Sequence, residues 1–550
     1  MSKQLKPGMA VPKPTKSGAR KRYYQRRVRR AWFLILAALI LTSVICVLVV
    51  NPVLAPNTTA SSVTEQQTAP FLSPTALPLS TQGLETDPPN NPTVSFPTIQ
   101  AVLPTQAQPV TYPKDTPVLY YAQSGDSLAV LAIHFGVELN EITSADELPQ
   151  EGLITPGQLL FIPSQLDSIS PSLKLIPDSE VVNSPSTLDF DVIAFVEEAG
   201  GYLSTYEEYL SSTGFQSGAE IVAKVALDYS VNPRLLLALL EYQSGWVYGS
   251  PSNIAEQDYA MGYVGYERKG FFNQCAWAAG EISDGYYGWR EGTIVALTFP
   301  DKTMLRFAPD LNSGTAGLIY LFSRLKNLPD WAEALYGENS IIDQYEQMFG
   351  SPWVRAQAYE PLFTVDVEQP EMILPFEFNK TWAFTGGPHA AWGVADVRAA
   401  LDFAPPSDGP GCLESPEWVL ASVSGLVVRS EHGAVVIDVD GDGYEQTGWN
   451  LLYMHIETKD RIPLGAWVEV GDRIGHPSCE GGRATGTHVH LARKYNGEWV
   501  PADGPLPFVL DGWKAKAGPT DYSGWLIKGD KIICACTAST FESQLRREEE

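Results

Sequence analysis

Basic residues are scarce in this chain once its first 30 residues are set aside. That segment holds eleven Lys or Arg and no Asp or Glu, which leaves 27 basic against 64 acidic residues and a net charge near −37 over the rest. Nucleic-acid binding rests on cations that neutralise phosphates. The balance therefore argues against a generic nucleic-acid-binding protein, although acidic charge alone does not identify a substrate.

Charged residues are absent from residues 31–50, AWFLILAALILTSVICVLVV. Twenty mostly apolar residues span roughly 30 Å as a helix, which is the thickness of a bilayer core. The preceding basic cluster, residues 1–30, is expected to stay in the cytoplasm. The sequence thus predicts a single-pass anchor in the cell membrane, with the N-terminus inside and everything after Val50 outside. A cleaved signal peptide is the alternative, but Pro56 follows the candidate cleavage site VLA and argues against cleavage.

Few charges occur in residues 51–117, which are rich in Pro, Thr, Ser and Gln. Such a composition cannot bury a core. We expect an extended stalk with stretches of polyproline II that holds the following domains away from the membrane. A linker without any length requirement is equally compatible.

Cysteine is sparse as well, with six residues, one of which, Cys46, lies in the predicted span. An exported region permits disulfides. Because five cysteines remain outside the span, at least one thiol is expected to be free or paired with another chain.

Histidine is scarce but clustered: six of the seven lie between His389 and His490. His488 and His490 are two residues apart, so on a strand both imidazoles point to the same face. One can then bind a metal while the other acts on substrate. A single histidine is more often exposed to solvent, or buried with its hydrogen bonds made. The cluster of six histidines, however, predicts a zinc site.

Further ligands stand upstream of this pair. WAFTGGPHAAWGVADVRAALDFAP supplies His389 and Asp402, and NLLYMHIE supplies His455 on an apolar strand. A catalytic zinc site usually takes three protein ligands and leaves one position for water.

The region from Pro375 to Gly512 resembles the lysostaphin-type and beta-lytic zinc endopeptidases, which cut peptide cross-links in bacterial cell walls. The motifs GGxH, a Tyr-x-His strand and C-E-G-G-x-x-T-G-x-H-x-H are closest to the beta-lytic branch. The lysostaphin branch has H-x-x-x-D, where this chain has Arg398, and a guanidinium cannot bind zinc. In the beta-lytic pattern His389 takes that role.

The resemblance implies that His389, Asp402 and His490 bind Zn²⁺. It also implies that His455 and His488 are catalytic and stand beside the water on the metal. A cysteine at the position of Cys479 is disulfide-bonded in the beta-lytic branch, and we expect Cys412 as its partner. By alternation along the strand, Tyr453 is expected on the same side as His455, close enough to contact substrate.

Residues 375–520 are predicted to form a mainly antiparallel β metallopeptidase domain, followed by a tail, residues 521–550, that is disordered from Cys534 onward. DVDGD, from Asp438 to Asp442, resembles the start of a calcium loop. The EF-hand pattern requires Glu at its twelfth position, where Trp449 stands. A plain acidic turn is therefore favoured over a Ca²⁺ site.

Residues 118–163 resemble a small α/β LysM module, through GDSL and PGQLLFIP. LysM modules bind glycans that contain N-acetylglucosamine, such as those of peptidoglycan. His134 is expected on the surface of the module's helix.

Residues 188–368 are predicted to be mainly helical, with a helix that starts at Asn232-Pro233. NPRLLLALLEYQSGW resembles the lytic transglycosylases of the lysozyme superfamily. Gln243 stands where that family has its catalytic acid and cannot donate a proton as a general acid. Glu241 lies two residues away, on another helical face. We expect this lysozyme-like domain to bind or position glycan rather than cleave it.

The sequence as a whole predicts a multidomain, membrane-anchored zinc endopeptidase that cleaves the peptide cross-links of peptidoglycan. The alternative is a non-catalytic scaffold that binds the cell wall and regulates other hydrolases. A domain that has lost its activity should lack one of the ligands, so the complete set favours the enzyme.

Overall fold

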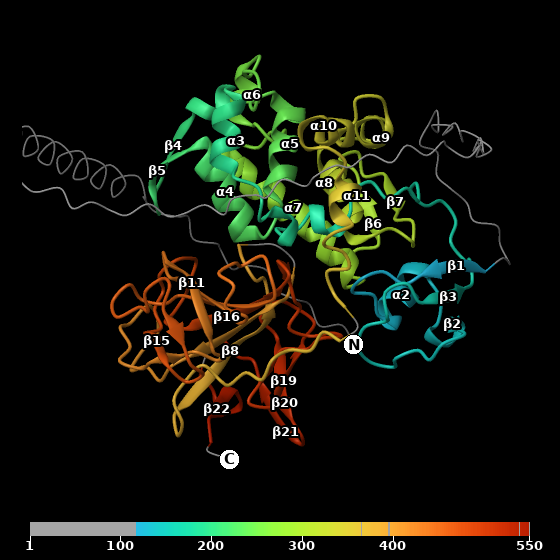
Figure 1. Cartoon of the computed structure of the whole chain (residues 1–550). Coiled ribbons are helices and arrows are strands. Elements are labelled where there is room, and N and C mark those ends of the chain that lie inside the picture. The colour runs from blue at the N-terminus through green and yellow to red at the C-terminus, as the bar shows by residue number, and fades with distance from the viewer. Residues whose placement is uncertain (1–116, 365, 394–396, 538, 549–550) are drawn as a thin grey trace, which may run out of the picture. The chain divides into compact units, whose positions relative to one another are not determined.

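The computed structural model describes residues 117–364, 366–393, 397–537 and 539–548 (Figure 1). All of the described residues belong to one compact unit. The predicted basic segment, the predicted membrane helix and the predicted stalk up to residue 116 lie outside the described residues. Within the described ranges, no helix is long and apolar enough to cross a membrane.

The first described module has its own small core beneath a three-stranded antiparallel sheet in the order β1-β3-β2. Its elements are β1 (Val118–Tyr121), α2 (Leu128–Phe135), η1 (Leu139–Glu141), β2 (Thr143–Ser144) and β3 (Leu159–Ile162). Ser127 occupies the position before α2, but its side chain makes no capping hydrogen bond.

The prediction that His134 lies on the surface of this helix is wrong. His134 is buried, its ring stacks on that of Trp289 with centroids 3.4 Å apart, and its Nε2 lies 2.8 Å from the Trp289 carbonyl oxygen. Helical spacing in one segment cannot reveal that this face of α2 packs against a distant part of the chain. Burial lowers the pKa of His134 to about 3.

The next region is mainly helical. Its elements are η2 (Asp178–Glu180), η3 (Pro185–Thr187), α3 (Val192–Ala199), η4 (Tyr202–Thr205), β4 (Glu207–Leu210), β5 (Gly214–Ser217), α4 (Gly218–Tyr229), α5 (Pro233–Ser244), α6 (Ile254–Asp258), η5 (Tyr266–Arg268), α7 (Phe271–Arg290), β6 (Ala296–Thr298), β7 (Met304–Arg306), α8 (Ser313–Leu325), α9 (Leu328–Tyr336), α10 (Ile341–Phe349) and α11 (Pro352–Ala356). Helix α5 begins where the sequence predicts, because Asn232 accepts a hydrogen bond from the Arg234 amide and Pro233 takes the first helical position.

The C-terminal domain is mainly antiparallel β, as predicted. A nine-stranded sheet has the order β14-β11-β12-β13-β16-β9-β8-β22, with β17 paired to β16, and a four-stranded sheet has the order β18-β19-β20-β21. The bounds are β8 (Thr381–His389), β9 (Ala400–Ala404), β10 (Val419–Leu420), β11 (Gly425–Glu431), β12 (Ala434–Asp438), β13 (Trp449–Met454), β14 (Trp467–Val468), β15 (Arg473–Gly475), β16 (Val489–Tyr495), β17 (Glu498–Trp499), β18 (Val509–Leu510), β19 (Trp513–Ala517), β20 (Gly524–Lys528), β21 (Lys531–Cys534), η6 (Phe541–Ser543) and β22 (Gln544–Arg546).

The two faces of the large sheet pack into different cores. Tyr453 and Leu491, on one face, belong to a core inside the β domain that also contains residues of the four-stranded sheet. Leu452 and Ala492, which pair across β13 and β16, belong to the core that the helical region contributes to. Because side chains alternate along a strand, His490 lies on the same face as Ala492.

The prediction that the chain is disordered from Cys534 onward is wrong. β22 pairs with β8 at the edge of the large sheet, Leu545 is buried, and Arg547 forms an ion pair with Asp511, with 3.0 Å between Nε and Oδ2. The short strand β22 directly precedes the charged C-terminal residues, so the sequence pattern did not indicate it. One apolar residue, Leu545, between two polar ones is enough to add a strand to an existing sheet.

Candidate metal centre

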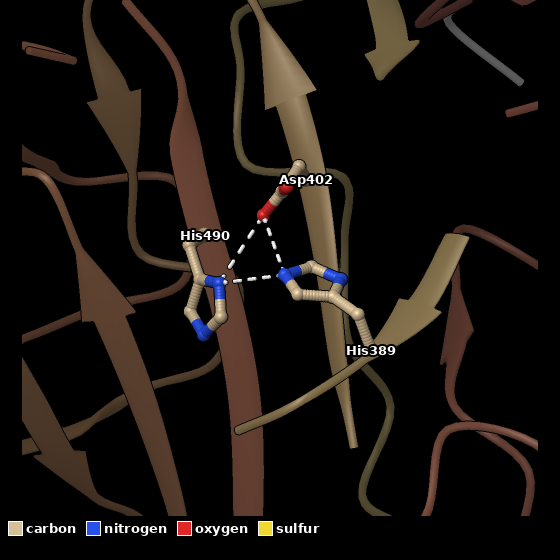
Figure 2. Close-up of side chains that lie close together, drawn as sticks. All are labelled: His389, Asp402 and His490. Atoms are coloured by element: carbon tan, nitrogen blue, oxygen red, sulfur yellow. Dashed lines mark hydrogen bonds and ion pairs between the residues drawn. The ribbon is translucent and has the colours of Figure 1, made fainter. Parts of the chain in front are cut away.

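Three side chains from three strands of the large sheet converge on one point (Figure 2). The Oδ1 atom of Asp402 lies 3.3 Å from Nε2 of His389 and 3.2 Å from Nδ1 of His490. The two imidazole nitrogens are 3.1 Å apart. These are the three residues that the sequence predicts as ligands, and all three are buried.

The local sequence allows this convergence. Asp402 on β9 is the cross-strand partner of His490 on β16, and His389 ends the neighbouring strand β8. A Cβ atom at Gly386, the first glycine of the GGPH motif, would collide with the carboxylate of Asp402. Glycine at this position therefore lets the carboxylate lie flat against β8.

Backbone carbonyls fix the orientation of both imidazoles. Nδ1 of His389 lies 2.8 Å from the Gly387 oxygen, and Nε2 of His490 lies 3.0 Å from the Ala391 oxygen. A carbonyl only accepts, so the ring nitrogen that faces it must carry the proton. When each ring is neutral, its other nitrogen presents a lone pair; backbone carbonyls orient metal-binding histidines in this way.

The point between these residues fits a cation. Two lone pairs and a carboxylate oxygen face one another at 3.1–3.3 Å, and Oδ1 of Asp402 is buried without a hydrogen-bond donor. Ligands bound tetrahedrally to zinc at 2.0–2.1 Å lie about 3.3 Å from each other. Burial would raise the pKa of Asp402, but His389 beside it holds that pKa well below its usual value. Asp402 is thus a carboxylate at neutral pH.

His455 and His488 stand next to this group without joining it. Their rings are 4.4 Å apart, and Nε2 of His488 lies 3.8 Å from Oδ1 of Asp402. Nδ1 of each ring faces a carbonyl at 2.8 Å, that of Glu480 for His455 and that of Gly486 for His488. Each Nε2 is therefore left as the acceptor. Burial lowers the pKa of His455 to about 4, so this ring is neutral at neutral pH.

The prediction that Tyr453 lies beside His455 near substrate is wrong. Strand β13 ends at Met454, and His455 has a positive φ of 66°, which breaks the alternation of side chains. Tyr453 points into the core of the β domain, where its hydroxyl accepts a hydrogen bond of 2.6 Å from the Ser422 amide. A sequence pattern for a strand cannot show that the strand stops one residue before the histidine.

Cys412 and Cys479, the predicted pair, are joined by a disulfide. The bond anchors the segment whose next residue, Glu480, offers its carbonyl to His455. The same segment approaches the 411–413 loop again at Thr487, whose amide donates to the Gly411 carbonyl over 3.1 Å. The disulfide thus ties together two loops beside the metal centre.

Tyr522 is a neighbour of the centre that the sequence does not reveal. Its ring stacks on that of His389 with centroids 4.1 Å apart, and its own carbonyl accepts a hydrogen bond from the Gly387 amide. Tyr522 falls in residues 521–550, which were predicted to be a tail, and no motif in that segment marks it as a neighbour of the metal ligands. Arg398 forms an ion pair with the adjacent Asp521 over 2.8 Å.

Two histidines of the sequence cluster are not part of the group. His476 packs against Trp418, with ring centroids 3.9 Å apart, and its Nδ1 faces the Glu417 carbonyl. His432 is exposed at the turn between β11 and β12. Proximity in sequence therefore overstated the number of histidines in the site.

Among the described residues, no comparable group forms around Gln243, the position where the lytic transglycosylases have their catalytic acid. Oε2 of Glu241 accepts hydrogen bonds from the amides of Val247 and Tyr248, at 2.8 and 3.1 Å. The carboxylate thus holds the loop that follows α5. Nε2 of Gln243 is buried without a hydrogen-bond partner.

Comparisons with known proteins agree with the β-domain assignment. Residues 174–362 match the family described as LasA, N-terminal domain. Protease LasA of Pseudomonas aeruginosa is 25% identical over 299 residues, which are 50% of this chain and 66% of LasA. The beta-lytic metalloendopeptidase of Achromobacter lyticus is 28% identical over 156 residues, which are 27% of this chain and 38% of that protein.

Among solved structures, pseudoalterin, described as an M23 metalloprotease from the deep sea, is 23% identical with a TM-score of 0.26, covering 30% of this chain and 96% of that one. The chain thus spans less than two thirds of the curated relatives named here. The helical region matches a LasA domain, and its resemblance to lytic transglycosylases stays a prediction, as does the LysM resemblance. The curated relatives are proteases and metalloendopeptidases, which supports the predicted resemblance of the C-terminal region to that class.

Proposed function

We propose that this chain is a membrane-anchored zinc endopeptidase that hydrolyses peptide cross-links of peptidoglycan. The observation that carries the proposal is the meeting of two imidazole nitrogens, from His389 and His490, and a carboxylate oxygen of Asp402 at one buried point. Imidazole and carboxylate together suit zinc. The metalloendopeptidases to which the chain is similar support the reaction class.

Zn²⁺ held by these three residues would act as a Lewis acid toward the scissile carbonyl and make a water molecule acidic near pH 7. The chain's own residues then handle the proton. Nε2 of His488, 3.8 Å from Asp402, and Nε2 of His455 are both acceptors. Either accepts the proton of the attacking water and returns it to the leaving amine. The carbonyls of Glu480 and Gly486 keep both rings in the required tautomer.

The other parts of the chain would keep the enzyme at its substrate. Residues 31–50 would anchor it in the cell membrane with the N-terminus inside, and residues 118–163 would bind the glycan strands. Protease added to intact cells should then remove the β domain. Protection of the domain in intact cells but not in lysates would reverse the orientation.

Metal content and cross-link hydrolysis, measured on the same samples, test the central proposal. Wild type should carry one Zn²⁺ per chain and release new amino groups from purified peptidoglycan, and a chelator should abolish the reaction until zinc is returned. His490→Ala should lose both properties, whereas His432→Ala, at an exposed turn, should keep both. Equal zinc in wild type and His490→Ala would refute the ligand assignment. Zinc binding without hydrolysis would favour the wall-binding scaffold.

A further inference from the structure

The loop between β12 and β13 gathers three carboxylates. Asp438 ends β12, and Asp440 and Asp442 follow it in the turn. Each offers an oxygen within 4.8 Å of an oxygen of the other two. Among the residues that the structure describes, no Lys or Arg side chain forms an ion pair with any of the three. Backbone amides of Gly441 and Gly443 donate to Asp438, but carboxylates this close still repel one another, and a cation bound between them would relieve that repulsion.

A buried amide stands on the neighbouring strand. Asn450 on β13 is the cross-strand partner of Asp438 and is 1% exposed. Its Nδ2 donates to the carbonyls of Thr447 and Tyr444, at 2.8 and 3.5 Å, so its amide lies inside the loop. Its Oδ1 is buried without a hydrogen-bond partner. Buried polar atoms without partners are rare in folded proteins and call for an unseen water or ion.

The donor set selects the kind of cation. All four groups are oxygens, with no imidazole or thiolate among them, and such sets suit hard cations. A flexible, irregular loop suits Ca²⁺ better than Mg²⁺, which demands near-ideal octahedral geometry and keeps several waters. The loop contains Gly441 and Gly443, both at positive φ, which lets it turn sharply around a centre.

We propose that the loop from Asp438 to Gly448 binds one Ca²⁺ through Asp438, Asp440, Asp442 and the Oδ1 atom of Asn450. This differs from the EF-hand, where Glu at position twelve supplies two oxygens; Trp449 stands there instead. Glu445 is not available either, because it is paired with Arg429 over 2.8 Å and with Lys494 over 3.5 Å. With four protein ligands we expect a weak site, with a Kd of about 10⁻⁴–10⁻³ M as in extracellular modules.

The site would stabilise more than its own loop. Glu445 lies in the same loop, and its partner Arg429 also binds Asp228 of α4 over 2.9 Å. Bound Ca²⁺ that orders the loop would therefore hold Glu445 in place for Arg429, at the contact between the sheet and the helical region. This role is independent of the proposed peptidase.

Terbium luminescence and calcium titration of the full chain test the site. Trp467 lies beside the loop, since a Cβ at Gly441 would approach its ring within 2.8 Å, and a nearby indole sensitises Tb³⁺. Wild type loaded with Zn²⁺ should show Tb³⁺ emission that Ca²⁺ displaces, and millimolar Ca²⁺ should raise its melting temperature. Asp440→Asn and Asp442→Asn should each weaken Ca²⁺ binding at least tenfold. Asp530→Asn, at an exposed turn between other strands, should bind as wild type does.

Two results would overturn the site. One is a folded wild type with no displaceable Tb³⁺ emission and no calcium effect at several millimolar Ca²⁺. The other is unchanged affinity in both loop variants. Asn450→Asp, which adds a charge at the fourth ligand, should tighten binding, and weaker binding would remove Asn450 from the ligand set. Zinc content is measured in the same samples, so failure of the calcium site is distinguishable from failure of the peptidase.

Discussion

The sequence singled out one carboxylate in the helical region and one in the β domain, and the structure holds the two in different ways. Glu241 lies in the helical region, two residues from the position where the predicted resemblance places a catalytic acid, and its carboxylate accepts from two backbone amides of a loop. Asp402, in the β domain, has an oxygen that meets two imidazole nitrogens and no hydrogen-bond donor. One oxygen of the Glu241 carboxylate holds a loop of the fold, whereas Oδ1 of Asp402 has no hydrogen-bond donor. An unsatisfied carboxylate oxygen at a buried point, rather than the residue type, distinguishes the candidate site.

Asp402→Asn should have the largest effect. It keeps the shape of the side chain but removes the charge that faces His389 and His490. Zinc affinity should fall by more than the roughly 10–100-fold that loss of an outer-shell partner causes, and hydrolysis of cross-links should become undetectable. Competition with a chelator measures the affinity. Asp408→Asn, an exposed substitution in a loop, is the matched control; zinc retained in Asp402→Asn would show that this carboxylate is not a ligand.

His488→Ala should separate proton transfer from metal binding. Nε2 of His488 is near the centre but outside the group of three, so zinc should stay bound while turnover falls by about 10²–10⁴-fold. His455→Ala should behave similarly. His476→Ala, whose ring packs on Trp418, should leave turnover unchanged. If His488→Ala loses zinc while His490→Ala keeps it, the roles of the two residues are exchanged.

His134 is buried and lies outside the candidate metal centre. Its burial should make the free energy of unfolding of the chain depend on pH. Burial lowers its pKa to about 3 in the folded chain, whereas the unfolded value is about 6.5. The unfolded chain thus binds the proton more readily, and stability present above pH 6.5 is lost as pH falls, by up to about 1.4 kcal/mol per unit. His134→Gln should remove that part of the slope. The free energy of unfolding of both proteins is measured with denaturant at pH 7.5, 6 and 5. If it falls with pH equally in wild type and His134→Gln, burial of His134 makes no contribution to the pH dependence.

Glu241→Gln should have the smallest effect. The amide oxygen still accepts from Val247 and Tyr248, but without charge, so the free energy of unfolding should fall by about 1 kcal/mol. Peptide hydrolysis should stay at the wild-type rate. Loss of a glycan-cleaving activity in this variant, with its fold retained, would make the helical region catalytic and end the contrast with the β domain.

The sequence identified the three side chains that meet on the sheet through short motifs, His-x-His and GGxH, and through the family resemblance that these motifs carry. Sheet register then brings His389, Asp402 and His490 together. Prediction from the sequence failed where tertiary packing decides the outcome. Tyr453 was misplaced because β13 ends before His455. Tyr522 was missed because it lies in a turn between β19 and β20, inside the segment that the sequence analysis treated as a tail.

The difference between local signals and tertiary packing also explains which features of the helical region and of the first module could be predicted. Helix α5 begins at Pro233 because the capping signal is complete within three residues. The burial of His134 depends on Trp289, which lies 155 residues away in sequence. No periodicity within α2 contains that information.

The chemistry of the products released from purified peptidoglycan tests the central claim most directly. The proposed hydrolysis takes place at the β-domain centre, and no reaction takes place at α5. The full chain should therefore release new amino groups and cross-link peptides, and should produce neither reducing ends nor anhydro-sugar ends. Release of glycan fragments that persists in His490→Ala would contradict that claim.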